Sequence, residues 1–260
     1  MPQIIQFNDF SELHNEKNIF FCKTDHITEE FDKISKIDSN VVLITGNSDI
    51  PITEETVNKA PKNISAWFCQ NNLSSNPRVF SLPLGIENTK ECKRSGHGVA
   101  WNFAEEKLKI LSTIFNKDIQ GNNQNLIYAN FNVDTNLDYR NTIKEHCLNL
   151  NHVNFKSGLP YEEFICDLLS HEAALCPVGN GIDTHRIYET LYANKVAIVF
   201  SDKQEFIYES LYKDLPVVLL QSLNDLDDEQ FLYKKINEAK SNNKQKLDLD
   251  FWKNKILSYV

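Results

Sequence analysis

The sequence predicts a two-lobed α/β protein in which each lobe is built on a parallel sheet. Short apolar runs alternate with helix-like patterns along the chain, and the runs are nearly continuous in Val, Ile, Leu and Ala. A polar stretch at 120–125, Gln-Gly-Asn-Asn-Gln-Asn, divides the 260 residues into two units. Continuous apolar strands that alternate with helices are typical of parallel sheets covered on both faces.

The composition excludes several classes of protein. Apolar residues make up 41% of the chain, which is enough to bury a core, so a disordered or fibrous protein is excluded. The formal net charge of −9 argues against a general nucleic-acid binder, which needs a basic face. No window approaches the ~18–20 apolar residues of a spanning helix. The chain also starts without a basic segment followed by an apolar one. We therefore expect no nucleic-acid partner, no transmembrane segment and a cytoplasmic location.

In the first half, four apolar runs bounded by turn residues predict strands at 19–22, 41–45, 66–69 and 79–82. A helix is predicted at 101–115, where Leu108, Leu111 and Phe115 recur at near-helical spacing. The polar stretch that follows is the best candidate for an interdomain linker.

The second half alternates more regularly. Strands are predicted at 126–131, 153–155, 173–176, 196–200 and 217–220. Helices are predicted at 139–150, 161–170, 184–193, 204–212, 229–241 and 249–259. No internal sequence repeat relates the two halves, so any similarity between the lobes is one of architecture.

Six cysteines are scattered along the chain without a Cys-x-x-Cys pair, which predicts reduced and mostly buried thiols. Asp225-x-Asp227 and Asp248-x-Asp250 have the spacing of a metal-diphosphate site. Each stands at the start of a predicted helix, where the helix dipole favours acidic residues. We therefore expect no metal site.

The most informative segment runs from 176 to 191, because ligands of open parallel sheets bind beyond the carboxyl ends of strands. A strand ends there, a Gly-Asn-Gly loop turns, and a helix opens at Asp183 or Thr184. Glycines allow close approach of a ligand, and a helix N-terminus offers free N–H groups to an anion. His185 and Arg186 add positive charge, and Glu189 follows one turn later.

This segment has an ordinary interpretation as well. Gly-Asn-Gly is compatible with a plain strand-to-helix turn, and Arg186 with Glu189 is compatible with a plain intrahelical ion pair. The loop lacks the Gly-Lys-Ser/Thr of a Walker loop and the complete Gly-x-Gly-x-x-Gly of a dinucleotide fingerprint.

The stretch LCPVGNGIDTHRIYETLYANKVAIVF resembles the donor-binding segment of exostosin-like glycosyltransferases of the two-Rossmann (GT-B) architecture, over about residues 126–220. The shared pattern is an apolar strand, a Pro/Gly loop, Arg-x-x-Glu on a helix, a turn and another apolar strand. The resemblance implies that Glu189 holds the nucleotide ribose and that Arg186 faces the phosphates. The chain departs from the family in its short length and in Asn194-Lys195, where a Gly-Cys type of turn is common.

The resemblance also implies a domain plan. Residues 1–122 form an acceptor-side Rossmann-like lobe and residues 123–245 a nucleotide-sugar donor lobe. Residues 246–260 form a C-terminal helix that crosses back to the first lobe. The predicted fold is thus α/β with two Rossmann-like lobes and parallel sheets (GT-B-like).

A second loop points to the same donor site. The strand that ends at Asn130 leads to Asn132 and then to Arg140 on the next predicted helix. The first strand–loop–helix unit of a donor lobe faces the cleft, so these three residues are candidates to contact a sugar or phosphate. An Asn-rich surface loop is the alternative. The predicted donor-binding set is Asn130, Asn132, Arg140, Gly179, Asn180, Gly181, Asp183, Thr184, His185, Arg186 and Glu189.

An inverting transfer needs a base on the acceptor lobe within reach of the acceptor hydroxyl. Asp49 and Glu87 follow predicted strands, with a glycine shortly before each, and are the preferred candidates. Asp25 with His26 is a third candidate. Each of these residues is also a common type of turn or cap residue.

The sequence therefore predicts a metal-independent glycosyltransferase that transfers a hexose or pentose from a nucleotide-sugar donor to a glycan or oligosaccharide hydroxyl. It needs no cofactor beyond that co-substrate. The alternatives are a non-catalytic nucleotide- or sugar-binding module and another α/β nucleotide-dependent enzyme, such as a sugar-nucleotide epimerase.

Overall fold

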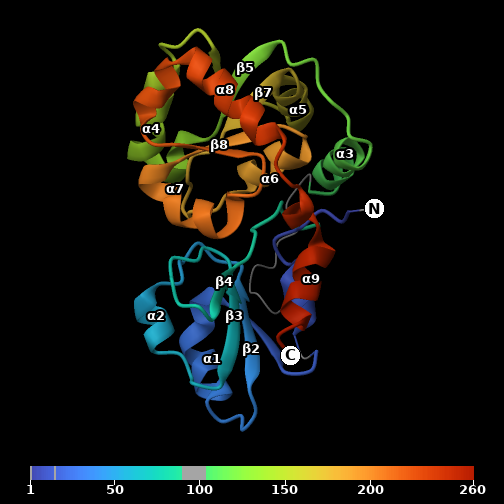
Figure 1. Ribbon diagram of the computed structural model, residues 1–260, viewed down its shortest axis with the longest axis vertical. Helices are drawn as coiled ribbons and strands as arrows, with labels where there is room; N and C mark the ends of the chain where they lie inside the picture. Colours follow the sequence, from blue (N-terminus) through green and yellow to red (C-terminus); the bar gives the residue numbers. More distant parts are fainter. Residues whose placement is uncertain (1, 15, 90–103) are drawn as a thin grey trace.

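The computed structural model describes residues 2–14, 16–89 and 104–260. Within these residues the strands form two parallel sheets, one of four strands and one of five. Figure 1 shows the sheets in separate lobes, one above the other, with the last helix running down beside the first lobe. The predicted fold class, two Rossmann-like lobes with parallel sheets and a returning C-terminal helix, is confirmed.

The first sheet has the strand order β1-β2-β3-β4. Its two faces follow from the two-residue alternation of side chains along each strand. Leu43 and Trp67 pack with Phe31 on one face, whereas Ile44 and Phe68 pack with Ile5 on the other. The elements of this lobe are β1 (Ile19–Lys23), α1 (Ile27–Ile34), β2 (Val41–Gly46), α2 (Glu54–Asn58), β3 (Ile64–Cys69) and β4 (Val79–Ser81).

Helices α1 and α2 are absent from the sequence-based prediction. In α1 the buried residues Ile27, Phe31 and Ile34 recur at intervals of four and three, which is the period of an amphipathic helix. In α2 the Thr53 side chain caps the helix by accepting from the Thr56 N–H. Both signals are present in the sequence but are short.

The second sheet has the order β6-β5-β7-β8-β9. After β5, the chain adds β6 on one side and then β7 on the other, so the strand order reverses between β5 and β7 although all strands are parallel. In an open α/β sheet such a switch point opens a crevice at the carboxyl ends of the two strands. The strands are β5 (Asn125–Asn130), β6 (Val153–Lys156), β7 (His171–Leu175), β8 (Val196–Phe200) and β9 (Val217–Leu220). The helices are α4 (Leu137–Cys147), α5 (Tyr161–Leu169), α6 (His185–Tyr192), α7 (Ser201–Ile207) and α8 (Glu229–Lys240).

The predicted helix at 204–212 begins earlier than expected, at Ser201, and its second half is a π-helical turn over Tyr208–Tyr212. The other elements of the second half appear within a few residues of their predicted positions. Near-continuous apolar strands such as β8, which is buried along its whole length, explain this agreement.

Two further helices join the lobes. Helix α3 (Ala104–Asn116) packs against α6, with Leu111 and Ile114 in the same apolar core as Leu168 and Tyr192. The first three residues of the helix predicted at 101–115 lie outside the described residues. The division of the chain at residue 122 stays a prediction.

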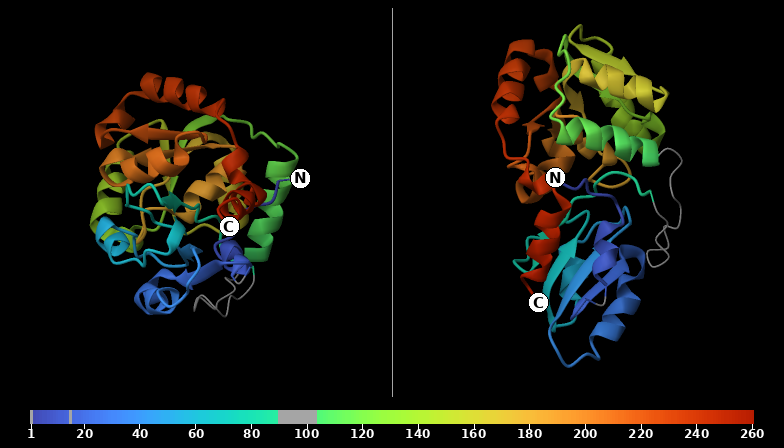
Figure 2. Two further views of the ribbon diagram at one scale, coloured as in Figure 1. Left: turned by 60° about the horizontal axis from the view of Figure 1, so that its bottom comes forward. Right: turned by 90° about the vertical axis from the view of Figure 1, so that its right-hand side faces the viewer.

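Helix α9 (Leu249–Leu257) returns to the first lobe, as Figure 2 also shows. Its first N–H donates to the Gln3 carbonyl at 3.0 Å. Just beyond it, Tyr259 contacts the rings of Phe68 and Phe80 at centroid distances of 5.4 and 5.0 Å. None of the helices described is long and apolar enough to cross a bilayer.

Candidate functional site

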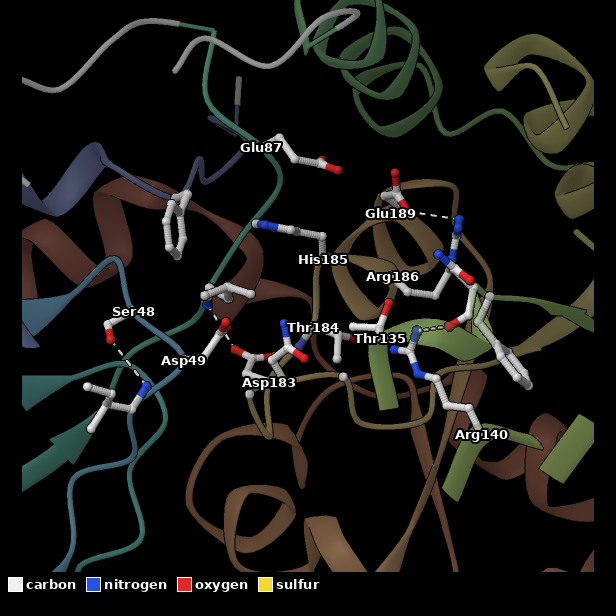
Figure 3. Close-up of a pocket in the computed structure, with 18 of the residues that line it drawn as sticks. Ser48, Asp49, Glu87, Thr135, Arg140, Asp183, Thr184, His185, Arg186 and Glu189 are labelled. Atoms are coloured by element: carbon white, nitrogen blue, oxygen red, sulfur yellow. Dashed lines mark hydrogen bonds and ion pairs between the residues drawn. The ribbon is translucent and has the colours of Figure 1, made fainter. Parts of the chain in front are cut away.

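A cavity of about 600 Å³ lies between the carboxyl ends of the two sheets. Loops that follow β2 and β4 line it from the first lobe, and loops that follow β5 and β7 line it from the second (Figure 3). It holds both predicted catalytic residues, Asp49 and Glu87, and every predicted donor-binding residue except Asn130. Asp49 and Glu189, which are 140 residues apart in sequence, therefore line the same site.

The switch point of the second sheet forms the floor of this cavity. Arg140, near the start of α4, is buried there and its guanidinium fastens the two loops together. It donates to the Asn132 carbonyl at 2.8 Å, to the Val178 carbonyl at 2.8 Å and to the Pro177 carbonyl at 3.1 Å. Burial and then the nearby Arg186 lower the pKa of Arg140 to about 10. The sequence singled Arg140 out as a ligand contact, but its five donors are largely committed to loop carbonyls.

The Gly-Asn-Gly loop is tight because protein side chains pack against its glycines. A Cβ at Gly181 would lie 3.0 Å from the Asn71 Oδ1, and one at Gly179 would lie 3.3 Å from the Arg140 Nη2. These glycines therefore admit Asn71 from the first lobe and Arg140 from α4. Asn180, between them, is exposed and lines the cavity.

Asp183 joins the two lobes rather than facing a ligand. One carboxylate oxygen accepts from the Tyr188 hydroxyl at 2.7 Å and from the Leu84 N–H of the first lobe at 2.8 Å. The other oxygen accepts from the Thr184 N–H at 2.9 Å and from the Tyr212 hydroxyl. Burial raises the pKa of Asp183 to about 6, against the lowering effect of these hydrogen bonds.

Helix α6 points its N-terminus into the cavity. The first N–H groups of any helix lack an intrahelical acceptor, and Thr184, the N-cap residue, makes no capping bond with its side chain. His185 Nδ1 lies 2.7 Å from the Gly85 carbonyl. Because a carbonyl only accepts, Nδ1 carries a proton in this hydrogen bond. The edge of the Phe7 ring at 5.6 Å further fixes this imidazole.

Four charged side chains that line the cavity are linked by consecutive ion pairs. Glu189 pairs with Arg186 at 2.8 Å and with Lys107 at 2.5 Å, and Lys107 pairs with Glu87 at 2.6 Å. Figure 3 shows Glu87 facing Glu189 and Arg186 across this space. Burial opposes ionisation of Glu87, but the positive charges of His185 and Lys107 outweigh it and lower its pKa to about 2.

Lys107 lines both cavities of the candidate site, and the sequence analysis did not single it out. It lies on α3, 20 residues after Glu87 and 82 before Glu189, and its side chain is 13% exposed. Its partners raise its pKa above the ordinary value, although burial acts in the opposite direction. No sequence motif links these positions, so only the packing of α3 on α6 brings Lys107 to the site.

The predicted acids of the first lobe lie in different settings. Asp49 is exposed at the turn after β2 and faces the cavity. Asp25 pairs with Lys23 at 3.3 Å on the same wall. Hydrogen bonds, first among them that of Ser48, lower the pKa of Asp25 despite a desolvation effect in the other direction. His26 does not line this cavity.

A second cavity of about 870 Å³ adjoins the first and shares Lys107, Phe131, Asn132, Arg186 and Glu189 with it. Asn130 lines this second cavity, and its amide donates to the Tyr128 hydroxyl at 2.8 Å. The cavity has an aromatic wall, formed by Phe131, Tyr161 and Phe164. The two cavities together form one extended cleft over the switch point.

Several buried polar atoms in this cleft have no hydrogen-bond partner among the described residues. They are Glu87 Oε2 and Thr184 Oγ1 in the first cavity and the Tyr161 hydroxyl in the second. Buried polar atoms are nearly always hydrogen-bonded, so a concentration of partnerless ones marks a place for a polar ligand.

The two Asp-x-Asp pairs have local roles. Asp225 forms a capping box with Ser222, and Asp227 pairs with His146 at 2.8 Å. Asp248 caps α9. In the part of the chain that is described, no three His, Cys, Asp or Glu side chains are grouped to hold a metal ion.

No protein-family model and no curated protein matches the sequence. Among solved structures, the chain is similar to a crystal structure of an alpha1,3-fucosyltransferase, with 13% identity and a TM-score of 0.49. The match covers 93% of this chain and 76% of the other. No match supports the resemblance to exostosin-like enzymes, and a likeness this distant carries no conclusion about activity.

Proposed function

We propose that this protein is a glycosyltransferase that binds a nucleotide-sugar donor on the second lobe and a hydroxyl acceptor on the first. The observation that carries the proposal is the set of partnerless buried atoms at the N-terminus of α6. Thr184 Oγ1 stands at the N-cap of α6, next to the first N–H groups of the helix, and Glu87 Oε2 belongs to a residue that lines the same cavity. Donors for an anion thus stand next to an acceptor for hydroxyl groups.

The chemistry of a nucleotide-sugar matches both halves of this set. Its diphosphate suits the α6 N-terminus, His185 and Arg186, because helix dipoles and cations stabilise phosphate. Its ribose and sugar hydroxyls suit Glu189 and Glu87, which accept hydrogen bonds as carboxylates. The adjoining aromatic-walled cavity, of about 870 Å³, has room for the nucleobase or the acceptor.

The transfer itself needs charge stabilisation and, if it inverts, a base. As the glycosidic bond to the donor breaks, negative charge grows on the diphosphate, where preorganised donors act most strongly. Asp49 suits the role of base, since it is exposed to the cavity on the acceptor side. Glu87, held ionised with a pKa of about 2, is a weak proton acceptor and suits the positioning of a hydroxyl.

The first test is a thermal-shift panel of UDP, GDP, CDP, CMP, ADP and NAD on the wild type and on Glu189→Gln. We expect one nucleoside diphosphate to raise the melting temperature and its affinity to fall at least tenfold in the variant, because a charged hydrogen bond contributes roughly 1.5–3 kcal/mol. Glu209→Gln is the matched control: its carboxylate pairs with Lys213 at 2.7 Å on the surface of the same lobe.

The nucleotide that binds then selects the sugar-nucleotides for a hydrolysis and transfer assay. If the wild type releases the nucleoside diphosphate from its sugar-nucleotide and Asp49→Asn does not, the result supports the transferase. Binding without any turnover supports the binding module instead, and a shift with NAD alone contradicts the proposal. A folded sample that responds to none of the nucleotides also contradicts it.

A further inference from the structure

A third cavity, of about 330 Å³, lies at the opposite end of the second sheet from the cleft. It is bounded by the start of β7, the residues before β8 and β9, the segment after α3, and the end of α8. Its lining is mostly polar and charged: Asp118, Gln120, Asn123, Glu172, Asn194, Lys195, Val196, Pro216, Lys240 and Lys244. Nothing in the proposed transfer uses this cavity.

Lys195 is the central group. The residue is 3% exposed, and its ammonium donates to the Leu169 carbonyl at 3.0 Å and to the Asn123 side-chain oxygen. Both acceptors are uncharged, and no carboxylate among the residues described lies within 4.0 Å of the Nζ. A buried cation without a counter-charge is costly, so this environment favours an anion.

The other charges around the cavity do not supply the missing anion. Glu172 is paired with Lys240 at 2.5 Å. The Asp118 carboxylate accepts from Gln120 at 2.9 Å, and Lys244 donates to the Asn194 amide oxygen at 2.8 Å. Three lysines thus face two carboxylates. Burial lowers the pKa of Lys195 to about 8 against the opposing charge of Glu172, and the charge of Lys240 adds a smaller lowering effect.

We propose that this cavity binds a small phosphate-bearing anion, held by Lys195 and Lys244 with Lys240 at its side. Phosphate suits the site because ammonium groups act on it as point charges from several directions. The volume is about half that of the first cavity in the cleft, which limits the ligand to a small molecule.

An anion in this cavity would also act on the connection between the lobes. Gln120 and Asn123 belong to the segment that leads from α3 into β5, and Asn123 adopts a positive φ of 49°. The same Asn123 accepts from Lys195. Binding there would therefore hold this segment against α5 and β8.

The test measures thermal shifts with inorganic phosphate and pyrophosphate, at constant ionic strength set with sodium chloride. The Arg186→Gln background removes a phosphate contact of the cleft, so that the two sites are told apart. We expect Arg186→Gln to be stabilised by both anions. Adding Lys195→Met or Lys244→Gln should weaken the apparent affinity at least tenfold.

Lys213→Gln in the same background is the control, because this lysine is exposed and paired with Glu209 in the same lobe. It should leave the shift unchanged. If the single variant Arg186→Gln already shows no shift, the anion binds in the cleft and the proposal is overturned. A shift that survives both lysine variants, or no shift in a folded protein, would overturn it too. If Lys195→Met does not fold, Lys244→Gln, which changes another lysine of the third cavity, still tests the proposal.

Discussion

At the scale of single residues, Lys107 separates two buried acids that would otherwise face one another. Its ammonium bonds Glu87 at 2.6 Å and Glu189 at 2.5 Å. The pKa of Glu87, about 2, lies below its ordinary 4.5, so this carboxylate stabilises the fold above pH 4.5 and loses that effect as the pH falls through 2. His185 and Lys107 together keep the Glu87 carboxylate ionised.

Replacing Lys107 with Met should therefore lower the free energy of unfolding at pH 7.5 by about 3–5 kcal/mol, the typical effect of removing one partner of a buried pair. The deficit should shrink at pH 5, because Glu87, once it has lost the ammonium group of Lys107, takes up a proton more readily. Urea denaturation at both pH values measures this. Adding Glu87→Gln should restore part of the stability, and an equal deficit at both pH values would contradict the expectation.

Sequence reasoning reached some residues of the site and not others, for physical reasons. Arg186 and Glu189 could be predicted as a pair because they are three positions apart on one helix. Lys107 could not, since its partners are distant in sequence. For Arg140 the position was predicted, but the geometry gives it backbone carbonyls to hold. Which partner a polar side chain finds depends on packing that no local pattern encodes.

At the scale of elements, α6 is tied to the first lobe through Asp183. Its carboxylate receives the Leu84 N–H at 2.8 Å, and its own N–H donates to the Asn71 side chain at 3.1 Å. The helix that offers its N-terminus to the cleft is thus fixed to both lobes at once. This connection defines the distance between the two walls of the site.

Asp183→Asn tests this connection. The pKa of Asp183, about 6, lies above its ordinary 3.8, so its contribution to stability is complete below pH 3.8 and declines as the pH rises through 6. The amide of Asn does not titrate, so this dependence on pH disappears. Its NH2 group also faces N–H and O–H groups that donate to the Asp183 carboxylate. We expect a loss of about 2–3 kcal/mol at pH 4.5 that shrinks by pH 8.

Chemical denaturation of both proteins across this pH range measures the difference. Asp228→Asn is the control, since Asp228 is an exposed N-cap of α8 and Asn caps equally well. A deficit that grows with rising pH would contradict the raised pKa.

The elements themselves were largely predictable. Strands such as β2 and β8 are buried from end to end, so a continuous apolar run identified each. Helix α1 was missed although Ile27, Phe31 and Ile34 carry its period, because eight residues give a short pattern. The strand orders could not be predicted, since the pairing of strands depends on contacts between residues that are distant in sequence.

At the scale of the whole molecule, one apolar core runs through both lobes. It includes Ile5, Phe21 and Phe68 of the first lobe, Tyr128 and Tyr188 of the second, and Trp252 of α9. Lobes that share a core and a returning helix are expected to unfold together.

Trp252→Ala should therefore destabilise the entire protein. The side chain is 1% exposed and its indole N–H donates to the Lys246 carbonyl at 2.8 Å, so its removal leaves a large cavity. We expect a loss of about 3–5 kcal/mol and a single transition by both fluorescence and far-UV circular dichroism. Tyr233→Ala, at a position that is 57% exposed, is the control. Two separate transitions would show that the lobes unfold independently.

The return of α9 also has a consequence for synthesis on the ribosome. The first sheet is complete once β4 has been made, at Ser81, but the rings of Phe68 and Phe80 gain their contact with Tyr259 only much later. At roughly 5–20 residues per second, translation leaves that part of the apolar face uncovered for roughly 10–35 s. The nascent first lobe therefore spends this interval as a target for chaperones or for aggregation, and it reaches its final state only when the last helix arrives.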